Sequence, residues 1–319
     1  SSRRRHTRYI SVTGVQTCAL PIWNGLYGRL GTGSTANIGD AANEMDDFLA
    51  PVDLGTGRTA TQIAVGSAHS CALLDNYDVK CWGQNDMGQL GYGDTVNRGD
   101  GPNEMGSNLL AVEFPSGRSA RSIVAGASHT CALLDNATVI CWGANDYGQL
   151  GQNSVAAIGD SSSTRVKDTT PINLGTGRTA LALAAGDGHT CAILDNSSVK
   201  CWGAGGNGRL GTNDTADVGD GIGSTVAALP SVDLGTGRTA LAISAGAAHM
   251  CAILDDASVK CWGNGADGRL GYGNANNQGD STGEMGDTLQ AVDLGTGRTA
   301  LAISAGGRSE EHTSELQSH

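Results

Sequence analysis

The sequence predicts an all-β fold, a β-propeller of four-stranded blades, and three observations support this. The chain repeats with a period of 60 residues. Each repeat holds several short apolar or alternating segments separated by turn residues, which is typical of β-strands. Glycine supplies 49 of the 319 residues and phenylalanine two, a composition that favours short strands joined by tight turns. Four short strands per repeat match a propeller blade; a solenoid of stacked hairpins is the alternative, although solenoid repeats are usually shorter.

The repeat keeps its register along the whole region that carries it. An arginine, a histidine, a tryptophan and a glycine recur at intervals of 60 residues without a shift of one position. These are Arg58, Arg118, Arg178, Arg238 and Arg298; His69, His129, His189 and His249; Trp82, Trp142, Trp202 and Trp262; and Gly28, Gly88, Gly148, Gly208 and Gly268. Residues 23–307 therefore hold about 4.75 repeats, divided as 23–57 (partial), 58–117, 118–177, 178–237, 238–297 and 298–307 (partial).

The first expected strand of a repeat covers residues 59–66, because in its counterpart 239–246 apolar residues alternate with other types. A fourth, weaker strand is expected at 51–54 or 291–294, before a Gly-Thr-Gly turn. The stretch of glycine, aspartate and asparagine that follows Gly91 is too polar to bury and is interpreted as a long surface loop.

The second and third expected strands, 69–74 and 79–83, form a hairpin around Asp75 and Asn76. Aspartate and asparagine supply side-chain turn bonds and tolerate a left-handed φ, which favours a turn at this point. In a loop centred on Asn76, residues at equal distances before and after Asn76 lie opposite each other in the two strands. The two cysteines of the hairpin test this register.

Each hairpin carries two cysteines ten residues apart. The pairs are Cys71 and Cys81, Cys131 and Cys141, Cys191 and Cys201, and Cys251 and Cys261. In the expected register the partners lie directly opposite on the same face, within the reach of a disulfide. Reduced core cysteines are one alternative. A zinc site from His69, Cys71 and Cys81 is another, although it lacks a fourth ligand.

The two ends of the chain, 1–22 and 308–319, are expected to be artefact. Residues 12–22 and 308–318 are encoded by the two strands of one oligonucleotide, which resembles the adapter of short-read sequencing libraries, as in an assembly of metagenomic reads. A natural chain would not carry both strands of one oligonucleotide at its ends. Residues 23–307 are therefore interpreted as a fragment of a propeller.

Charge and hydropathy exclude two classes of partner. The formal net charge is −12, with 32 acidic and 20 basic residues. Nucleic-acid binding needs clustered basic residues, so no nucleic-acid partner is expected. No apolar run approaches the roughly 20 residues that a membrane-spanning helix needs, so no membrane span is expected.

The string HTCALLDNATVICWGANDYGQLG at 129–151, with copies at 69–91, 189–211 and 249–271, resembles the repeat of the regulator of chromosome condensation family. The resemblance covers 23–307 and implies a propeller of seven blades, of which this chain supplies fewer than five. Members of that family exchange nucleotide on a small nuclear GTPase, sense ultraviolet light in plants, or inhibit β-lactamase as secreted bacterial proteins. The fold therefore does not fix the function.

The recurring His and Trp residues are interpreted as structural. A catalytic residue is needed once, whereas these recur in every complete repeat, so we expect the His to pack and hydrogen-bond at the hairpin and the Trp to fill the space between blades. No Ser/His/Asp, paired-carboxylate or phosphate-loop pattern is present in the sequence, and no catalytic residue is assigned.

The long loops carry acidic residues that could offer oxygen ligands to Ca²⁺, the one cofactor considered. These are Asp94, Asp100 and Glu104 in one loop and Asp280, Glu284 and Asp287 in another. Their spacing matches no strict calcium-loop pattern, and solvated loops are the simpler interpretation. Arg98, Gly99 and Asp100 also spell an integrin-binding tripeptide, but other repeats keep only the Gly-Asp.

Recognition is expected at exposed loop positions that vary between blades, because positions identical in every blade are explained by the architecture. The candidate binding residues are Asp86, Met87, Tyr92, Asp146, Tyr147 and Tyr272. Tyr and Met are enriched at binding surfaces. The sequence thus predicts a non-catalytic binding propeller with an unknown protein or surface ligand as its partner. The alternatives are an exchange factor for a small GTPase and a metal-dependent hydrolase.

The cysteine pairs predict an extracellular or cell-surface location, because disulfides persist in oxidising compartments. A cytoplasmic location is the alternative and would keep the thiols reduced.

Overall fold

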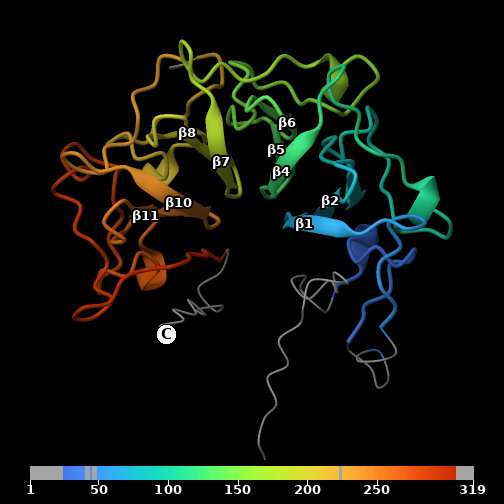
Figure 1. Ribbon diagram of the computed structural model, residues 1–319, viewed down its shortest axis with the longest axis horizontal. Coiled ribbons are helices and arrows are strands. Elements are labelled where there is room, and N and C mark those ends of the chain that lie inside the picture. The colour runs from blue at the N-terminus through green and yellow to red at the C-terminus, as the bar shows by residue number, and fades with distance from the viewer. Residues whose placement is uncertain (1–23, 40–43, 45–48, 223–224, 307–319) are drawn as a thin grey trace, which may run out of the picture.

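The computed structural model describes residues 24–39, 44, 49–222 and 225–306 and shows four small antiparallel sheets set in an open arc (Figure 1). Segments 1–22 and 308–319, expected to be artefact, lie outside the described residues. Each sheet has three strands in chain order, so neighbours in sequence are also neighbours in the sheet. The all-β propeller predicted from the sequence is confirmed, with one blade for each complete repeat.

We name the sheets blades I to IV. Blade I holds β1 (Ala60–Val65), β2 (His69–Leu74) and β3 (Val79–Gly83); blade II holds β4 (Ala120–Ala125), β5 (His129–Leu134) and β6 (Val139–Gly143); blade III holds β7 (Ala180–Ala185), β8 (His189–Leu194) and β9 (Val199–Gly203); blade IV holds β10 (Ala240–Ala245), β11 (His249–Leu254) and β12 (Val259–Gly263). The 3-10 turns are η1 (Leu26–Gly28), η3 (Gly106–Asn108), η4 (Val166–Asp168), η5 (Gly206–Gly208) and η6 (Ala266–Gly268). The first strand of each blade lies nearest the centre of the arc (Figure 1).

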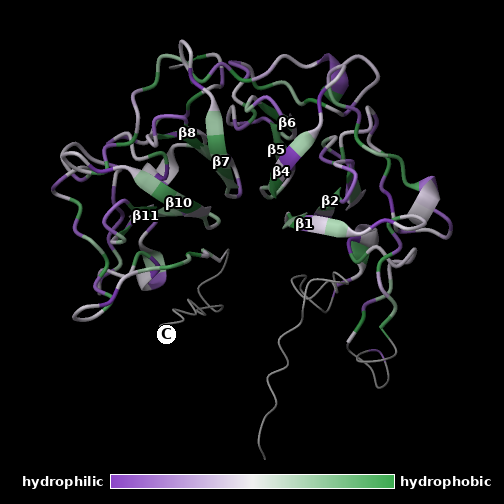
Figure 2. Ribbon diagram, in the orientation of Figure 1, coloured by the Kyte–Doolittle hydropathy of each residue, from purple (hydrophilic) through white to green (hydrophobic). Residues whose placement is uncertain are grey.

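The core lies within and between the blades. Every residue of β2 and β3, and of their counterparts in the other blades, is buried. The first strands are buried less completely, with Thr61 exposed between its neighbours. Polar residues gather in the long outer loops (Figure 2). This distribution follows from the repeat, since a thin sheet must bury both faces against its neighbours.

The fourth strand expected at 51–54 or 291–294 does not form. Segment 291–294 makes one backbone bond to the third strand of a blade, from Val292 N to Val259 O at 2.8 Å, and Val112, Ile172 and Val232 make the same bond in other repeats. The chain then turns, because the side chain of Asp293 accepts a bond from Gly295 N. In other repeats the next carbonyl is taken by a buried lysine: Lys260 Nζ donates to Leu234 O. Beyond this bond, the edge of the third strand away from the second pairs, in the described part of the chain, only through its last glycine, as in the bridge between Gly83 and Arg98, and the blades keep three strands.

The hairpin register predicted from the sequence is confirmed. Cys71 lies opposite Cys81, and the loop between β2 and β3 has three residues centred on Asn76. The left-handed φ, however, falls on the third loop residue, Tyr77 (φ 68°), and not on Asp75 or Asn76. Those two supply side-chain bonds instead, because Asp75 accepts from Thr59 N and Asn76 from Asp78 N.

The recurring arginine pairs with the aspartate of this loop. Arg58 lies 3.6 Å from Asp75, and the equivalent pairs of the other three blades span 3.3–3.5 Å. These side chains are about one-third exposed, so each pair contributes little to stability on its own. Its repetition nevertheless explains why the arginine holds its position in the sequence.

Four disulfides form, one in each hairpin, as the register requires. They join Cys71 to Cys81, Cys131 to Cys141, Cys191 to Cys201 and Cys251 to Cys261. All eight sulfurs belong to buried residues. The reduced and zinc-bound alternatives do not describe this structure, because each sulfur is bonded to its partner cysteine.

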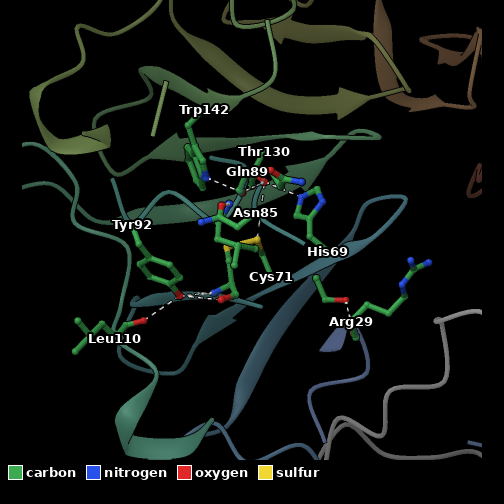
Figure 3. Close-up of a disulfide and its surroundings, with 12 residues drawn as sticks. Arg29, His69, Cys71, Asn85, Gln89, Tyr92, Leu110, Thr130 and Trp142 are labelled. Carbon is green, nitrogen blue, oxygen red and sulfur yellow. Dashed lines mark hydrogen bonds between the residues drawn. A yellow bond between two sulfur atoms is a disulfide. The ribbon is translucent and has the colours of Figure 1, made fainter. Parts of the chain in front are cut away.

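Consecutive blades are joined by a buried network around one carbonyl group (Figure 3). The carbonyl oxygen of Gln89 accepts bonds from the indole of Trp142 and from the hydroxyl of Thr130, each at 3.0 Å. The ring of His69, in the preceding blade, lies 2.9 Å from the same hydroxyl. The recurring His and Trp side chains thus make hydrogen bonds that run between blades.

This network fixes the tautomer of the histidine. Because the hydroxyl hydrogen of Thr130 is donated to Gln89, His69 Nε2 must carry the proton that it donates to Thr130. His69 Nδ1 is then an unprotonated nitrogen without a hydrogen-bond partner. The ring packs against Gly66, where any Cβ would overlap with it. This close approach explains the glycine three residues before each histidine.

One junction lacks part of this network. At the junction between blades III and IV, Met250 stands where the preceding blades have Ser70, Thr130 and Thr190. Both ring nitrogens of the buried His189 are consequently without a hydrogen-bond partner. An unsatisfied buried donor costs about 1–3 kcal/mol. Blades III and IV are therefore joined less strongly than blades I to III.

We expect Met250→Thr to be more stable than the isosteric Met250→Val by about 1–2 kcal/mol, because only the hydroxyl can accept from His189. Urea unfolding of the two variants measures the difference. In the converse experiment, Thr190→Val should lower the free energy of unfolding by a similar amount, because His129 loses its hydrogen-bond partner. A valine variant at 250 as stable as the threonine one would refute the assignment.

The buried histidines should make the protein acid-sensitive. Burial lowers the pKa of His69 to about 4 and of His129 to about 3, whereas the unfolded value is about 6.5. At pH values between the folded and unfolded pKa, the histidines of the unfolded chain are protonated and those of the folded chain are not. The free energy of unfolding therefore falls as pH falls from 7 to 5. Each histidine contributes up to about 1.4 kcal/mol per pH unit. Urea titrations at several pH values should show a shallower slope for His69→Gln; parallel slopes would contradict this.

Candidate functional site

The loops that follow the third strands carry the expected binding residues, and their backbones are held by buried amides. Asn85 and Gln89 are buried. Asn85 accepts from Leu90 N and donates to Val96 O, while Gln89 accepts from Met87 N at 2.9 Å. The loop tip is thereby fixed with its side chain pointing away from the core. Met87 is 42% exposed.

The next blade repeats this arrangement with a different tip. Asn145 accepts from Leu150 N, and Gln149 accepts from Tyr147 N at 2.9 Å. Tyr147 is 49% exposed. The acidic residues that precede the tips, Asp86 and Asp146, are also exposed. The expectation that these four residues lie on the surface is therefore met.

Three of the candidate residues meet at one cavity of about 520 Å³. It lies between the loops of blades II and III, with Met87 of the preceding blade on its edge. Its lining includes Met87, Asp146, Tyr147, Asp187, Arg209 and Asp217. Asp86 does not line it. The structure thus gathers Met87, Asp146 and Tyr147 into a single concave site.

Charge in the cavity is predominantly negative. Asp217 accepts a bond from Gly205 N, and Arg209 Nε donates to Gly206 O. Burial lowers the pKa of Arg209, while Asp187 and Asp217 raise it. Desolvation raises the pKa of Asp187, which Arg209 lowers. Three carboxylates therefore surround one guanidinium.

Sequence reasoning missed Asp187 and Arg209. Asp187 departs from the repeat, because its equivalents are Ser67, Ala127 and Ala247. Arg209 stands where Gln89 and Gln149 clamp their loops, and Arg29 and Arg269 share this change. The available signal was therefore Asp187 alone, an acidic residue at a position where the architecture does not require one.

Tyr92 and Tyr272 do not belong to this site. Both are partly buried, and the hydroxyl of Tyr92 accepts from Cys81 N and donates to Cys81 O at 2.8 Å (Figure 3). Tyr272 makes the same pair of bonds to Cys261. Burial raises the pKa of Tyr272 to about 12. The expectation that the two tyrosines are exposed is wrong. Each ring lies along β3 or β12, and its hydroxyl bonds to the backbone of that strand.

The acidic loops considered for Ca²⁺ use their carboxylates internally. Glu104 Oε2 accepts from the backbone N–H groups of Gly99, Asp100 and Gly101 at 2.9–3.1 Å. Glu284 repeats this with residues 279–281. Asp94 pairs with Arg98, and Asp287 accepts from Thr236 N and its hydroxyl. Because backbone N–H groups donate to these glutamate carboxylates, the carboxylates are not arranged as ligands for a cation.

The Arg-Gly-Asp tripeptide is likewise occupied within the fold. Arg98 pairs with Asp94 at 2.8 Å and lies 5.4 Å above the ring of Tyr92. Gly99 is buried. The tripeptide therefore stabilises its own loop and does not present an adhesion motif. Among the described residues, no group of three His, Cys, Asp or Glu side chains is placed to hold a metal ion.

Repeated three-stranded blades around a centre, tied by Trp at each junction and by His at the first two, define a β-propeller of repeat type. The profile of the regulator of chromosome condensation (RCC1) repeat matches residues 60–89, 120–149, 181–209 and 241–269. A second profile of this repeat matches 79–133 and 136–193. The chain belongs to the RCC1 repeat family.

Two curated relatives are similar over most of the repeats. The ultraviolet-B receptor UVR8 of Arabidopsis thaliana is 31% identical over 230 residues, 72% of this chain and 47% of that protein. The probable E3 ubiquitin-protein ligase HERC4 of Homo sapiens is 30% identical over 218 residues, 68% of this chain and 18% of that protein. The chain thus spans less than half the length of either relative.

Solved structures share the fold. Yeast RCC1 (Prp20), bound to Kap60, superposes with a TM-score of 0.62 at 18% identity, covering 96% of this chain and 67% of that one. Prp20p from Saccharomyces cerevisiae, studied for its binding to Gsp1p and histones, gives a TM-score of 0.59 at 18% identity, covering 81% and 56%. Within the described residues, no helix has the length and hydropathy to cross a membrane.

We expect Tyr272→Phe to lower the free energy of unfolding by about 1–2 kcal/mol, because Cys261 N and O lose their partner. Urea unfolding measures the change. Tyr147→Phe is the matched control: its hydroxyl makes no hydrogen bond within the described part of the chain, and its stability should stay at the wild-type value. Equal stability of all three proteins would show that the buried hydroxyl contributes nothing.

Proposed function

We propose that this propeller is a non-catalytic binding module that recognises a partner protein through the cavity beside Tyr147. The observation that carries the proposal is the convergence of Met87 and Tyr147, both exposed and both on rigid loops, at one concave site. Exposed aromatic and thioether side chains around a cavity are typical of the anchors in protein interfaces. Rigid loops favour this use, because binding then orders little additional chain.

Likeness to known propellers supports a protein partner. Yeast RCC1 (Prp20) was solved with Kap60 bound, and Prp20p was studied for its binding to Gsp1p and histones. Those partners are partners of the yeast protein. At 18% identity, the likeness shows a shared fold only. What transfers to this proposal is the use of a repeat propeller as a protein-binding surface.

We also propose that the protein works outside the cytoplasm. Four buried disulfides, one in each complete blade, are costly to maintain where thiols are kept reduced. Titration of free thiols in the protein isolated from its native host tests this, and eight titratable repeat cysteines would overturn it.

A photo-crosslinking residue in place of Tyr147 should capture the partner from a native extract. The affinity of the purified partner is then measured against wild-type protein and the double variant Met87→Ala/Tyr147→Ala. Loss of two interface anchors should weaken binding by about tenfold or more.

Tyr77→Ala is the matched control for that experiment. Tyr77 is 62% exposed but lies on the hairpin of blade I, away from the cavity lining. Its removal should leave the affinity unchanged. A partner that binds the double variant as tightly as wild type would place recognition elsewhere on the molecule.

A further inference from the structure

We infer that the cavity beside Tyr147 takes a basic side chain, arginine or lysine, presented by the partner. This inference rests on the proposed function and adds the chemistry of the group that is bound. It is carried by the shape of the cavity wall and by two carboxylates in the lining that make no hydrogen bond or ion pair with a described residue.

The wall is suited to a cation with an apolar stem. The ring of Tyr147 lies against Gly188, where an added Cβ would be 3.2 Å from its Cδ2 atom. Glycine thereby lets the ring rest on the backbone of the neighbouring blade, and its exposed part borders the cavity. Met87 supplies a polarizable thioether on the edge. An aromatic ring attracts a guanidinium or ammonium group placed over it, and the alkyl stem packs on the apolar side chains.

The charges favour a cation over an anion. Asp146 and Asp187 make no side-chain hydrogen bond or ion pair with any described residue, and no ion pair joins Arg209 to Asp187 or Asp217 within 4.0 Å in the same part of the chain. Arg209 is already bonded to Gly206 O. Two carboxylates are therefore free to pair with an incoming group, whereas the single guanidinium is held by the loop.

Neighbouring loops lack this combination. In blade I, Asp86 accepts from the side chains of Gln84 and Gln89. In blade IV, Asp267 pairs with Arg269 at 3.0 Å. Asp86, at the register position of Asp146, is thus bonded within its loop, and Asp267, one position later in blade IV, is paired within its own; Asp146 has no such bond. Asp187 adds the second carboxylate, at a position where the other blades have Ser or Ala.

The direct test uses small probes on the 319-residue chain. With 3-fluorotyrosine at position 147, the ¹⁹F resonance is followed while Nα-acetyl-arginine methylamide is added, and then its neutral citrulline counterpart. The arginine and lysine derivatives should give a saturable shift that weakens as salt is raised, because the contact is electrostatic. The citrulline derivative should bind at least about tenfold more weakly.

Charge-neutral variants locate the effect. Asp146→Asn/Asp187→Asn should reduce the affinity for the arginine derivative by about tenfold or more, since it removes the two unpaired charges. Asp86→Asn, at the equivalent loop position of blade I, and Asp267→Asn, one position later in blade IV, are the controls, and their affinity should stay at the wild-type value. All variants are first checked for an unchanged unfolding midpoint. Equal binding of the citrulline derivative, or an unaffected double variant, overturns the inference.

The captured partner separates this inference from the proposed function. If partner affinity falls with Met87→Ala/Tyr147→Ala but is insensitive to Asp146→Asn/Asp187→Asn and to salt, the cavity binds a protein without using a basic side chain. If the arginine derivative binds while partner affinity survives all of these substitutions, the cavity binds cations but is not the partner site.

Discussion

The structure depends on one buried carbonyl at each junction between blades. Separate sheets have no strand ladder to join them, so the link must come from side chains, and the oxygen of Gln89 receives both Trp142 and Thr130. The histidine of the preceding blade completes the connection through the threonine hydroxyl. Because donor and acceptor lie on different repeats, the network fixes the hairpin of one blade against the loop of the blade before it.

The same requirement separates architecture from recognition. Gln89 and Gln149 serve the core through their backbone carbonyls, while their side chains clamp the loop tips from beneath. The tip residue needs only its backbone N–H for this, so its side chain is free to differ from blade to blade. Met87 and Tyr147 occupy such tips. Rigid support with a variable side chain is how a repeat fold can acquire a specific site.

The hairpins and disulfides could be predicted from the sequence because they depend on local register: a loop centred on Asn76 leaves Cys71 opposite Cys81. The absence of a fourth strand at 51–54 or 291–294 could not be predicted, because packing decides which segment pairs with the third strand: Gly83 pairs with Arg98 of the following loop, and Val292 makes a single bond to Val259. The orientation of the Tyr92 side chain is also set by packing. The sequence shows that this position varies between blades, but it does not show whether the ring points toward β3 or toward solvent. Glu104 looked available for a cation because sequence reveals its charge but not its three donors.

The placement of basic residues explains why the surface should attract cations. Lys80, Lys200 and Lys260 are buried and donate to backbone carbonyls, so they organise the loops much as a bound cation would. In blade II the equivalent is Ile140, and Phe114 packs edge-on against Trp142 nearby. The recurring arginines are paired with loop aspartates. With much of its basic charge committed inside the fold or at its turns, a chain of net charge −12 presents mainly carboxylates to solvent. The partner proposed above is therefore expected to be basic, and a field that added salt screens would steer its approach.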